Sequence, residues 1–248
     1  MKRQPPGPYG IIYADPPWGH RDKAKAGNRG ASFKYPTMQT ADIAALDVRG
    51  LAARDCACIM WAVPPMIGDA LYVMHSWGFR FSTFPFVWVK TAPAGISAKA
   101  RKLLRGSDQL LSLNPKTAGR IVDVLGGAGL LAPGLFWGMG LSTRANVEVC
   151  LLGVRGRLGR VSGGVHQVVQ APPGRHSEKP AEVRQRIVQL LGDRPRIELF
   201  ARERAPGWHA WGNDPALGEP DVDLQPRPVV VVPKSTDLVA PVAELCRG

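Results

Sequence analysis

Short apolar runs recur along the chain, each bounded by glycine, proline or charged residues, and segments with helical spacing lie between them. Runs of this length and composition predict β-strands. We expect strands at residues 10–14, 56–63, 81–90, 147–154, 165–171 and 195–201. Because strands that alternate with helices usually build a sheet with both faces covered, the pattern predicts an α/β fold.

Apolar residues at intervals of three or four predict helices between these strands. Residues 40–53 and 66–77 each carry such a stripe. The clearest helix is residues 179–191, with Pro180 in its first turn, where proline is tolerated. Its apolar stripe consists of Val183, Ile187, Leu190 and Leu191.

Two segments depart from this alternation. Residues 91–139 have weak periodicity, a GGAG stretch and many basic side chains, and we interpret them as an insertion that recognises the target; a solvated surface loop is the alternative. Residues 214–248 are rich in proline and acidic residues, which predicts an extended or partly disordered tail. The sequence thus predicts one domain, residues 1–213, with an insertion and a C-terminal tail.

Composition is ordinary for one globular domain, with 248 residues of which 45% are hydrophobic, but the charge is not. The formal net charge is +12, and residues 214–248 hold three basic and six acidic side chains, so residues 1–213 carry about +15. A domain with this much net positive charge favours a nucleic-acid partner. A soluble protein of high isoelectric point without such a partner is the alternative.

The four cysteines do not have the spacing of a metal site, since no Cys-x-x-Cys pair and no zinc-finger histidine accompanies them, and we expect no metal. Cys56 and Cys58 alternate within CACIMWAV, which predicts that both face one side of a buried strand as reduced thiols. The N-terminus lacks the apolar run of a signal peptide, and no stretch is long enough to span a bilayer. These features predict a cytoplasmic protein with no membrane partner.

The candidate chemistry lies directly after the first predicted strand, in the sequence ADPPW. Asp15 ends the strand with a carboxylate at the carboxyl edge of the sheet, and Pro16 and Pro17 fix the backbone and lack N–H donors. The Asp15 carboxylate and the Pro16 carbonyl suit an amine that donates both of its hydrogens, which favours a pyramidal nitrogen whose lone pair faces an electrophile. A nucleobase amine fits, with Trp18 or Tyr35 stacking on the base once it has left the duplex. Alternatively, the prolines only end the strand and Trp18 packs in the core.

Several segments downstream of this corner match the motifs of one enzyme family in order. They are YPTM (35–38), FVWVKT (86–91), STRANVEVCLLGVRG (142–156), HSEKPAEV (176–183) and IELFAR with GWHAWGND (197–214). Together with DPPW (15–18) they resemble the S-adenosylmethionine-dependent N6-adenine methyltransferases of the DPPW type, the family of the catalytic subunit of the eukaryotic mRNA adenosine methyltransferase and its bacterial and phage relatives. The resemblance covers about residues 10–214 outside the insertion. It implies a Rossmann-like methyltransferase fold with a mixed, mostly parallel sheet, helices on both faces and a permuted motif order.

The resemblance also implies roles for individual residues. Asp15 and Pro16 would hold the target amine, while Pro17 and Trp18 would shape the pocket. The residues that would bind S-adenosylmethionine are Lys179, at the carboxylate of its methionine portion, and Glu198, Leu199, Phe200, Arg202 and Asn213, the last two near the ribose hydroxyls. The residues that we expect to contact the substrate are Tyr35, in a mobile loop near the base, and the basic side chains of Lys90, Lys99, Arg101, Lys102, Arg105 and Arg144.

Structural roles are the alternative for several of these positions. Lys179 before Pro180 can simply start a helix, and Glu198 with Arg202 can form an ion pair. Trp208 and Trp211 alternate and are more typical of core packing than of base stacking. The chain has no G-x-G-x-x-G motif, which disfavours an enzyme that uses NAD.

The main hypothesis is therefore methyl transfer from S-adenosylmethionine to the N6 amine of adenine in DNA. RNA adenosine methylation uses the same corner and stays an alternative, as does a non-catalytic nucleic-acid-binding subunit. Methylation of N4 of cytosine is disfavoured, because such enzymes usually have Ser where this chain has Asp15. The sequence leaves open whether the protein is a monomer or a homodimer and which target sequence it recognises.

Overall fold

The structure is a computed structural model that describes residues 7–19, 37–92, 114, 116–117, 120, 135–136, 138, 140, 142–174 and 178–227. These ranges include the whole DPPW motif and the segment from the last predicted strand to Asn213. The predicted substrate contacts that fall outside them are Tyr35, Lys99, Arg101, Lys102 and Arg105. Among the described helices, none is long and apolar enough to cross a membrane.

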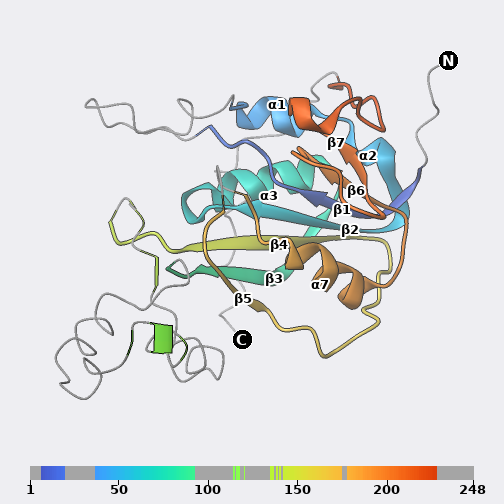
Figure 1. Cartoon of the computed structure of the whole chain (residues 1–248). Coiled ribbons are helices and arrows are strands. Elements are labelled where there is room, and N and C mark those ends of the chain that lie inside the picture. The colour runs from blue at the N-terminus through green and yellow to red at the C-terminus, as the bar shows by residue number, and fades with distance from the viewer. Residues whose placement is uncertain are drawn as a thin grey trace, which may run out of the picture. The chain divides into compact units, whose positions relative to one another are not determined.

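Within the part of the chain that the structure describes, seven strands form one sheet in the order β5-β3-β4-β2-β1-β6-β7 (Figure 1). In chain order they are β1 (Tyr9–Ala14), β2 (Ala52–Ala62), β3 (Arg80–Lys90), β4 (Val147–Arg155), β5 (Val168–Ala171), β6 (Arg196–Leu199) and β7 (His209–Trp211). Strand β1 pairs in parallel with β2 and β6, β6 pairs in parallel with β7, and β4 runs antiparallel to β2. This mixed, mostly parallel sheet with its helices confirms the predicted Rossmann-like methyltransferase fold. The sequence pattern did not predict β7, which is only three residues long.

The helices differ from the prediction at two places. The single helix predicted at residues 40–53 is instead α1 (Thr40–Ala45) and α2 (Val48–Leu51), because Leu46 is extended and Asp47 caps α2 by accepting the Gly50 amide. Helix α3 (Ile67–Ser76) follows a short 3-10 turn, η2 (Pro64–Met66). Helix α7 (Glu182–Leu191) begins three residues later than predicted, so Pro180 precedes the helix instead of lying in its first turn.

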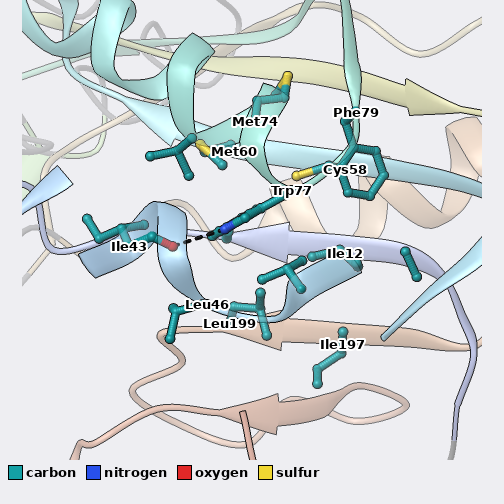
Figure 2. Close-up of a cluster of buried hydrophobic side chains, with 14 of the residues drawn as sticks. Ile12, Ile43, Leu46, Cys58, Met60, Met74, Trp77, Phe79, Ile197 and Leu199 are labelled. Atoms are coloured by element: carbon teal, nitrogen blue, oxygen red, sulfur yellow. Dashed lines mark hydrogen bonds between the residues drawn. The ribbon is translucent and has the colours of Figure 1, made fainter. Parts of the chain in front are cut away.

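One face of the sheet packs against α1 and α3 to form the main core (Figure 2). The strand side chains on this face include Ile12, Cys58, Met60, Ile197 and Leu199. The indole N–H of Trp77, just after α3, donates to the carbonyl of Ile43 at 3.0 Å. This buried polar group therefore has a hydrogen-bond partner within the core. Cys56 and Cys58 are fully buried, as predicted, and burial raises the pKa of Cys56 to about 12 and that of Cys58 well above its ordinary value.

The opposite face is covered by α7, whose buried residues are Val183, Ile187 and Leu191 (Figure 1). Because side chains alternate along a strand, Tyr13 of β1 lies on this face between the core residues Ile12 and Ala14 of the other face. Tyr13 pairs in register with Glu198 of β6, so the two side chains are neighbours under α7. Both helix layers that the sequence predicted are therefore present.

The chain divides into two compact units. Unit 1 comprises residues 1–87, 148–167 and 182–248, and it contains β1, β2, β6, β7 and all the helices named above. Unit 2 comprises residues 88–147 and 168–181, and so includes the predicted insertion. Within unit 2, the buried Trp88 donates its indole N–H to the carbonyl of Ala171 at 2.9 Å.

The chain beyond residue 213 packs on unit 1 as far as the structure describes it. Val222 and Leu224 are 4% and 5% exposed and belong to the main core. Pro226 forms a bridge with Leu46, next to the Asp47 amide, which donates to the carbonyl of Gln225 at 3.1 Å. The domain therefore continues to at least residue 227, beyond the boundary predicted at residue 213. Residues 228–248 of the predicted tail lie outside the described residues.

Candidate active site

Strands β1 and β6 end side by side at the carboxyl edge of the sheet. Ala14 pairs with Leu199, and the Asp15 amide donates to the Leu199 carbonyl at 3.4 Å. Because the strands are parallel, Asp15 and Phe200 leave the sheet at the same edge, where open α/β sheets usually bind ligands. Two segments that are far apart in the sequence thus meet at this edge of the sheet.

The DPPW motif forms a tight corner held by its own backbone. The Trp18 amide donates to the Pro16 carbonyl at 2.9 Å, which closes a three-residue γ-turn around Pro17. The proline ring fixes φ close to the value that this turn requires. The Pro17 carbonyl accepts from the Met38 amide at 2.9 Å. One lone pair of the carbonyl oxygen of the buried Pro16 is therefore used within the corner, and that oxygen has one further lone pair.

Trp18 anchors this corner to the sheet. Its side chain is 5% exposed and belongs to the main core, and its indole N–H donates to the carbonyl of Trp61 on β2 at 3.0 Å. A buried indole of this kind offers little free surface for base stacking. The geometry therefore favours the alternative in which Trp18 packs in the core and holds the shape of the corner.

Asp15 is half-buried and lies close to the polar side chains beneath α7. Tyr13 accepts a hydrogen bond from the Trp61 indole at 2.5 Å. Burial, and after it the nearby Cys150 and Glu198, raise the pKa of Tyr13 well above its ordinary value, so its hydroxyl stays protonated. Burial also raises the pKa of Glu198, against the effect of Arg184, and the charge of Asp15 raises it further. Two carboxylates, Asp15 and Glu198, are thus electrostatic neighbours at this edge.

The turn after β6 has an unusual backbone. Phe200 has φ of 60°, in the left-handed region that a bulky residue adopts only where its surroundings hold it. Its ring packs edge-on against Trp211 at 5.3 Å between centroids, and the Ala201 amide donates to the Trp211 carbonyl at 2.9 Å. A Cβ at Gly212 would lie 2.2 Å from the Ala201 carbonyl oxygen, so only glycine allows this close approach. The turns after β6 and β7 are therefore packed together.

An arginine from α7 binds the chain at both ends of this turn. Arg184 forms a bidentate ion pair with Glu198, at 2.7 Å from Nε to Oε2 and 3.0 Å from Nη2 to Oε1. Its Nη1 also contacts Glu203 at 3.1 Å. Glu198 thus has a structural ion pair, as one alternative predicted, and Arg184 is its partner in that pair. Nothing in the sequence pattern singled out Arg184, because it lies among other polar residues of an amphipathic helix.

Unit 1 brings together most of the predicted site residues. They are Asp15, Pro16, Pro17, Trp18, Glu198, Leu199, Phe200, Arg202 and Asn213. Leu199 is fully buried in the core, whereas Asn213 is exposed and Arg202 is half-buried. Asp214, next to Asn213, caps the 3-10 turn η4 (Pro215–Leu217) by accepting the Ala216 amide at 2.9 Å.

Lys90, Arg144 and Lys179 belong to unit 2. The Lys90 ammonium lies 4.8 Å from the centre of the Trp88 ring, a cation–π distance. The Lys90 amide donates to the carbonyl of Asn146, two residues after the exposed Arg144, at 2.8 Å. These two predicted contact residues therefore come from neighbouring segments of unit 2.

The family model for MT-A70 matches residues 9–111 and 137–214, well over half of the chain. The chain belongs to the MT-A70 family. This MT-A70 chain is also 30% identical over 222 residues to the Type II methyltransferase M.MunI of a Mycoplasma species, an alignment that covers 82% of this chain and 76% of that protein.

The MT-A70 match confirms the family that the DPPW motif and its downstream segments predicted, and together with the relative's name it supports methyltransferase activity. Both matched ranges contain residues at the carboxyl edge of the sheet, where β1 and β6 end, since the first range includes Asp15 and the second includes Phe200. The unmatched residues 112–136 lie within the predicted insertion, so the MT-A70 match extends into that segment as far as residue 111.

Proposed function

We propose that this chain transfers a methyl group from S-adenosylmethionine to the N6 amine of adenine in DNA. The observation that carries the proposal is the corner at Asp15 and Pro16, an acceptor pair at the carboxyl edge of β1 beside the turn after β6. Membership of the MT-A70 family supplies the methyl-transfer chemistry. The corner supplies the reason why an amine is the acceptor.

The corner acts on an amine through hydrogen-bond acceptors. The Asp15 carboxylate and the remaining lone pair of the Pro16 carbonyl each accept one N–H of the target. The lone pair of an exocyclic amine is delocalised into the base, and binding both hydrogens favours the pyramidal form in which that lone pair is available for attack. Asp15 also stabilises the positive charge that develops on the nitrogen, which is an interaction made mainly in the transition state.

The residues around the corner fit S-adenosylmethionine by the chemistry of their donors. Arg202 and Asn213 carry N–H donors that suit ribose hydroxyls, and the packed rings of Phe200 and Trp211 give an apolar surface that suits adenine. When bound, this cofactor supplies a methyl group on a positively charged sulfur, which the carboxylate of Asp15 favours electrostatically. Lys179 keeps the role that the family resemblance implies, a contact with the carboxylate of the methionine portion.

The charge of the chain and its relative support a nucleic-acid substrate. A net charge of +12 attracts polyanions and speeds their encounter. The relative is named a type II methyltransferase, which favours DNA over RNA. An adenine inside a duplex cannot reach a corner at a sheet edge, so the base leaves its stack before the reaction.

The decisive experiment replaces Asp15 with Asn, which keeps the size of the side chain and removes its charge. We expect the rate of methyl transfer to DNA adenine to fall by about 10²-fold or more, as for the loss of one preorganised electrostatic contact. Nucleoside mass spectrometry of the DNA measures N6-methyladenine directly. Asp42→Asn, an exposed acid in the first turn of α1, is the matched control and should retain full activity.

Three outcomes would remove the proposal. A D15N variant that methylates adenine at the wild-type rate excludes the corner as the amine-binding site. Methylation found only in RNA, or only at N4 of cytosine, excludes DNA adenine as the substrate. A wild-type chain that binds DNA tightly but gives no heat with S-adenosylmethionine in calorimetry is a binding subunit and not an enzyme.

A further inference from the structure

The polar residues beneath α7 include one that the proposed chemistry does not use directly. Arg184 bonds the chain on both sides of the turn after β6: it contacts Glu198, in β6, and Glu203, after the turn. We call these three residues the clasp. Between its two acidic ends lie Phe200 and Arg202, two of the residues proposed to bind the cofactor.

The two ends of the clasp differ in strength. Glu198 is 7% exposed and binds Arg184 through both of its oxygens, the geometry in which a carboxylate and a guanidinium fit best. The side chain of Glu203 is 60% exposed and makes a single contact at 3.1 Å. Burial lowers the pKa of Arg184, but the bonds to Glu198 outweigh it and hold the pKa above its ordinary value, so the guanidinium stays charged.

The turn inside the clasp needs such support. The left-handed backbone of Phe200 is sparsely populated for a bulky residue and persists only when neighbouring groups determine it. The bond from the Ala201 amide to the Trp211 carbonyl holds one side of the turn. The clasp holds the strand before the turn and the chain after it through one rigid, planar side chain.

We propose that Arg184 is a positioning residue for cofactor binding, which by bonding Glu198 and Glu203 together fixes the turn that carries Phe200 and Arg202. This inference rests on the proposed function, because it assumes that the turn binds S-adenosylmethionine. Arg184 itself touches no reacting group. Its loss therefore weakens cofactor binding while the chemistry at Asp15 is preserved.

The first test opens the weak end of the clasp with Glu203→Gln. The buried pair of Arg184 with Glu198 stays intact, so the variant folds. We expect the Kd for S-adenosylmethionine, measured by calorimetry, to rise about two- to fivefold, the range for a single exposed ion pair. Glu182→Gln is the matched control, since Glu182 is also a partly exposed acid paired with an arginine of α7, Arg186, and its Kd should not change.

The second test replaces the planar guanidinium of Arg184, which can bond two carboxylates, with the single ammonium group of lysine. Arg184→Lys keeps the positive charge beside Glu198, but lysine cannot hold two carboxylates in one plane. We expect Kd to rise by about tenfold, while the turnover number at saturating cofactor stays within about twofold of wild type, as for a loss of binding alone. The control is Arg186→Lys, which changes an arginine two residues along the same helix that contacts Glu182 and the His166 carbonyl.

Hydrogen exchange without cofactor separates this inference from the proposed function. In E203Q and R184K, the amides of residues 200–203 should exchange faster than in wild type, and in E182Q and R186K they should not. Unchanged exchange in R184K, or a lower turnover number with an unchanged Kd, overturns the role of Arg184. A wild-type chain that binds no S-adenosylmethionine overturns the proposed function and the cofactor role of the clasp together, and the exchange rates then show whether Arg184 still orders the turn.

Discussion

At the scale of single residues, Trp18 connects three parts of unit 1. Its amide closes the turn on Pro16, its backbone bridges Met38, and its indole donates to Trp61 on β2. A substitution that keeps an aromatic ring but removes the indole N–H therefore tests the connection without emptying the core. The same loss can be made at Trp77, whose indole donates to the Ile43 carbonyl and not to the strand that anchors the corner.

We predict that Trp18→Phe lowers both stability and activity. The Trp61 carbonyl loses its buried donor, which should lower the free energy of unfolding by about 1–3 kcal/mol in urea titrations. Because the corner loses its anchor, methyl transfer should fall as well, by about tenfold. Trp77→Phe should cost similar stability and leave activity per folded molecule unchanged. Equal activity in the two variants would show that the anchor does not serve the corner.

Some of these residue roles could be predicted from the sequence, and others could not. The acceptor corner followed from local chemistry, because an acid, two prolines and a strand end are adjacent in the chain. The ion-pair partner of Glu198, in contrast, could not be predicted from the sequence. Spacing suggested Arg202, which is close to Glu198 in the sequence, whereas Arg184 approaches Glu198 from a separate helix.

At the scale of elements, β4 carries a glycine where α3 presses on the sheet. A Cβ at Gly153 would lie 2.7 Å from Sδ of Met74 and 2.8 Å from Cβ of Phe79, distances that side chains do not tolerate. The strand therefore uses glycine for close approach and not for backbone freedom. Gly159, in the loop after β4, has no described heavy atom within 4 Å of an added Cβ.

Gly153→Ala should consequently destabilise the protein while Gly159→Ala does not. Overpacking between β4 and α3 should lower the free energy of unfolding by about 1–3 kcal/mol. The control should stay within about 0.5 kcal/mol of wild type. Denaturant midpoints with unchanged slopes measure both. A G153A variant as stable as wild type would mean that α3 can move away from the sheet at little cost.

Element type was predictable because apolar runs and stripes have different periods, and boundaries were less so. Strand β2 begins at Ala52, four residues earlier than expected. The polar residues Arg54 and Asp55 interrupt the apolar pattern there, so the pattern did not indicate the first residues of the strand. Helix α7 begins later than expected, since Pro180 permits a helix start without requiring one. The buried contacts of Val222 and Leu224 were concealed by the prolines and acids around them.

At the scale of the whole molecule, the excess of basic residues should dominate binding to nucleic acid. Each lysine or arginine that contacts a phosphate releases bound counterions, so affinity falls as salt rises. We predict that DNA affinity drops about tenfold between 50 and 200 mM salt for every two phosphates contacted. Fluorescence anisotropy with a labelled duplex measures this slope. The affinity for S-adenosylmethionine, measured in parallel, should change little, and a DNA affinity independent of salt would contradict the charge argument.

The order of the motifs along the chain has a consequence for synthesis. Strand β1 is followed by its partner β2 within the next fifty residues, but its other neighbour, β6, is translated only after β2, β3, β4 and β5. Until then β1 is an exposed edge, a liability for aggregation in a growing chain. The DPPW corner, the turn at Phe200 and the clasp come together only when residues 196–213 have been translated. A nascent chain therefore carries the DPPW motif well before the edge of the sheet beside that motif is complete.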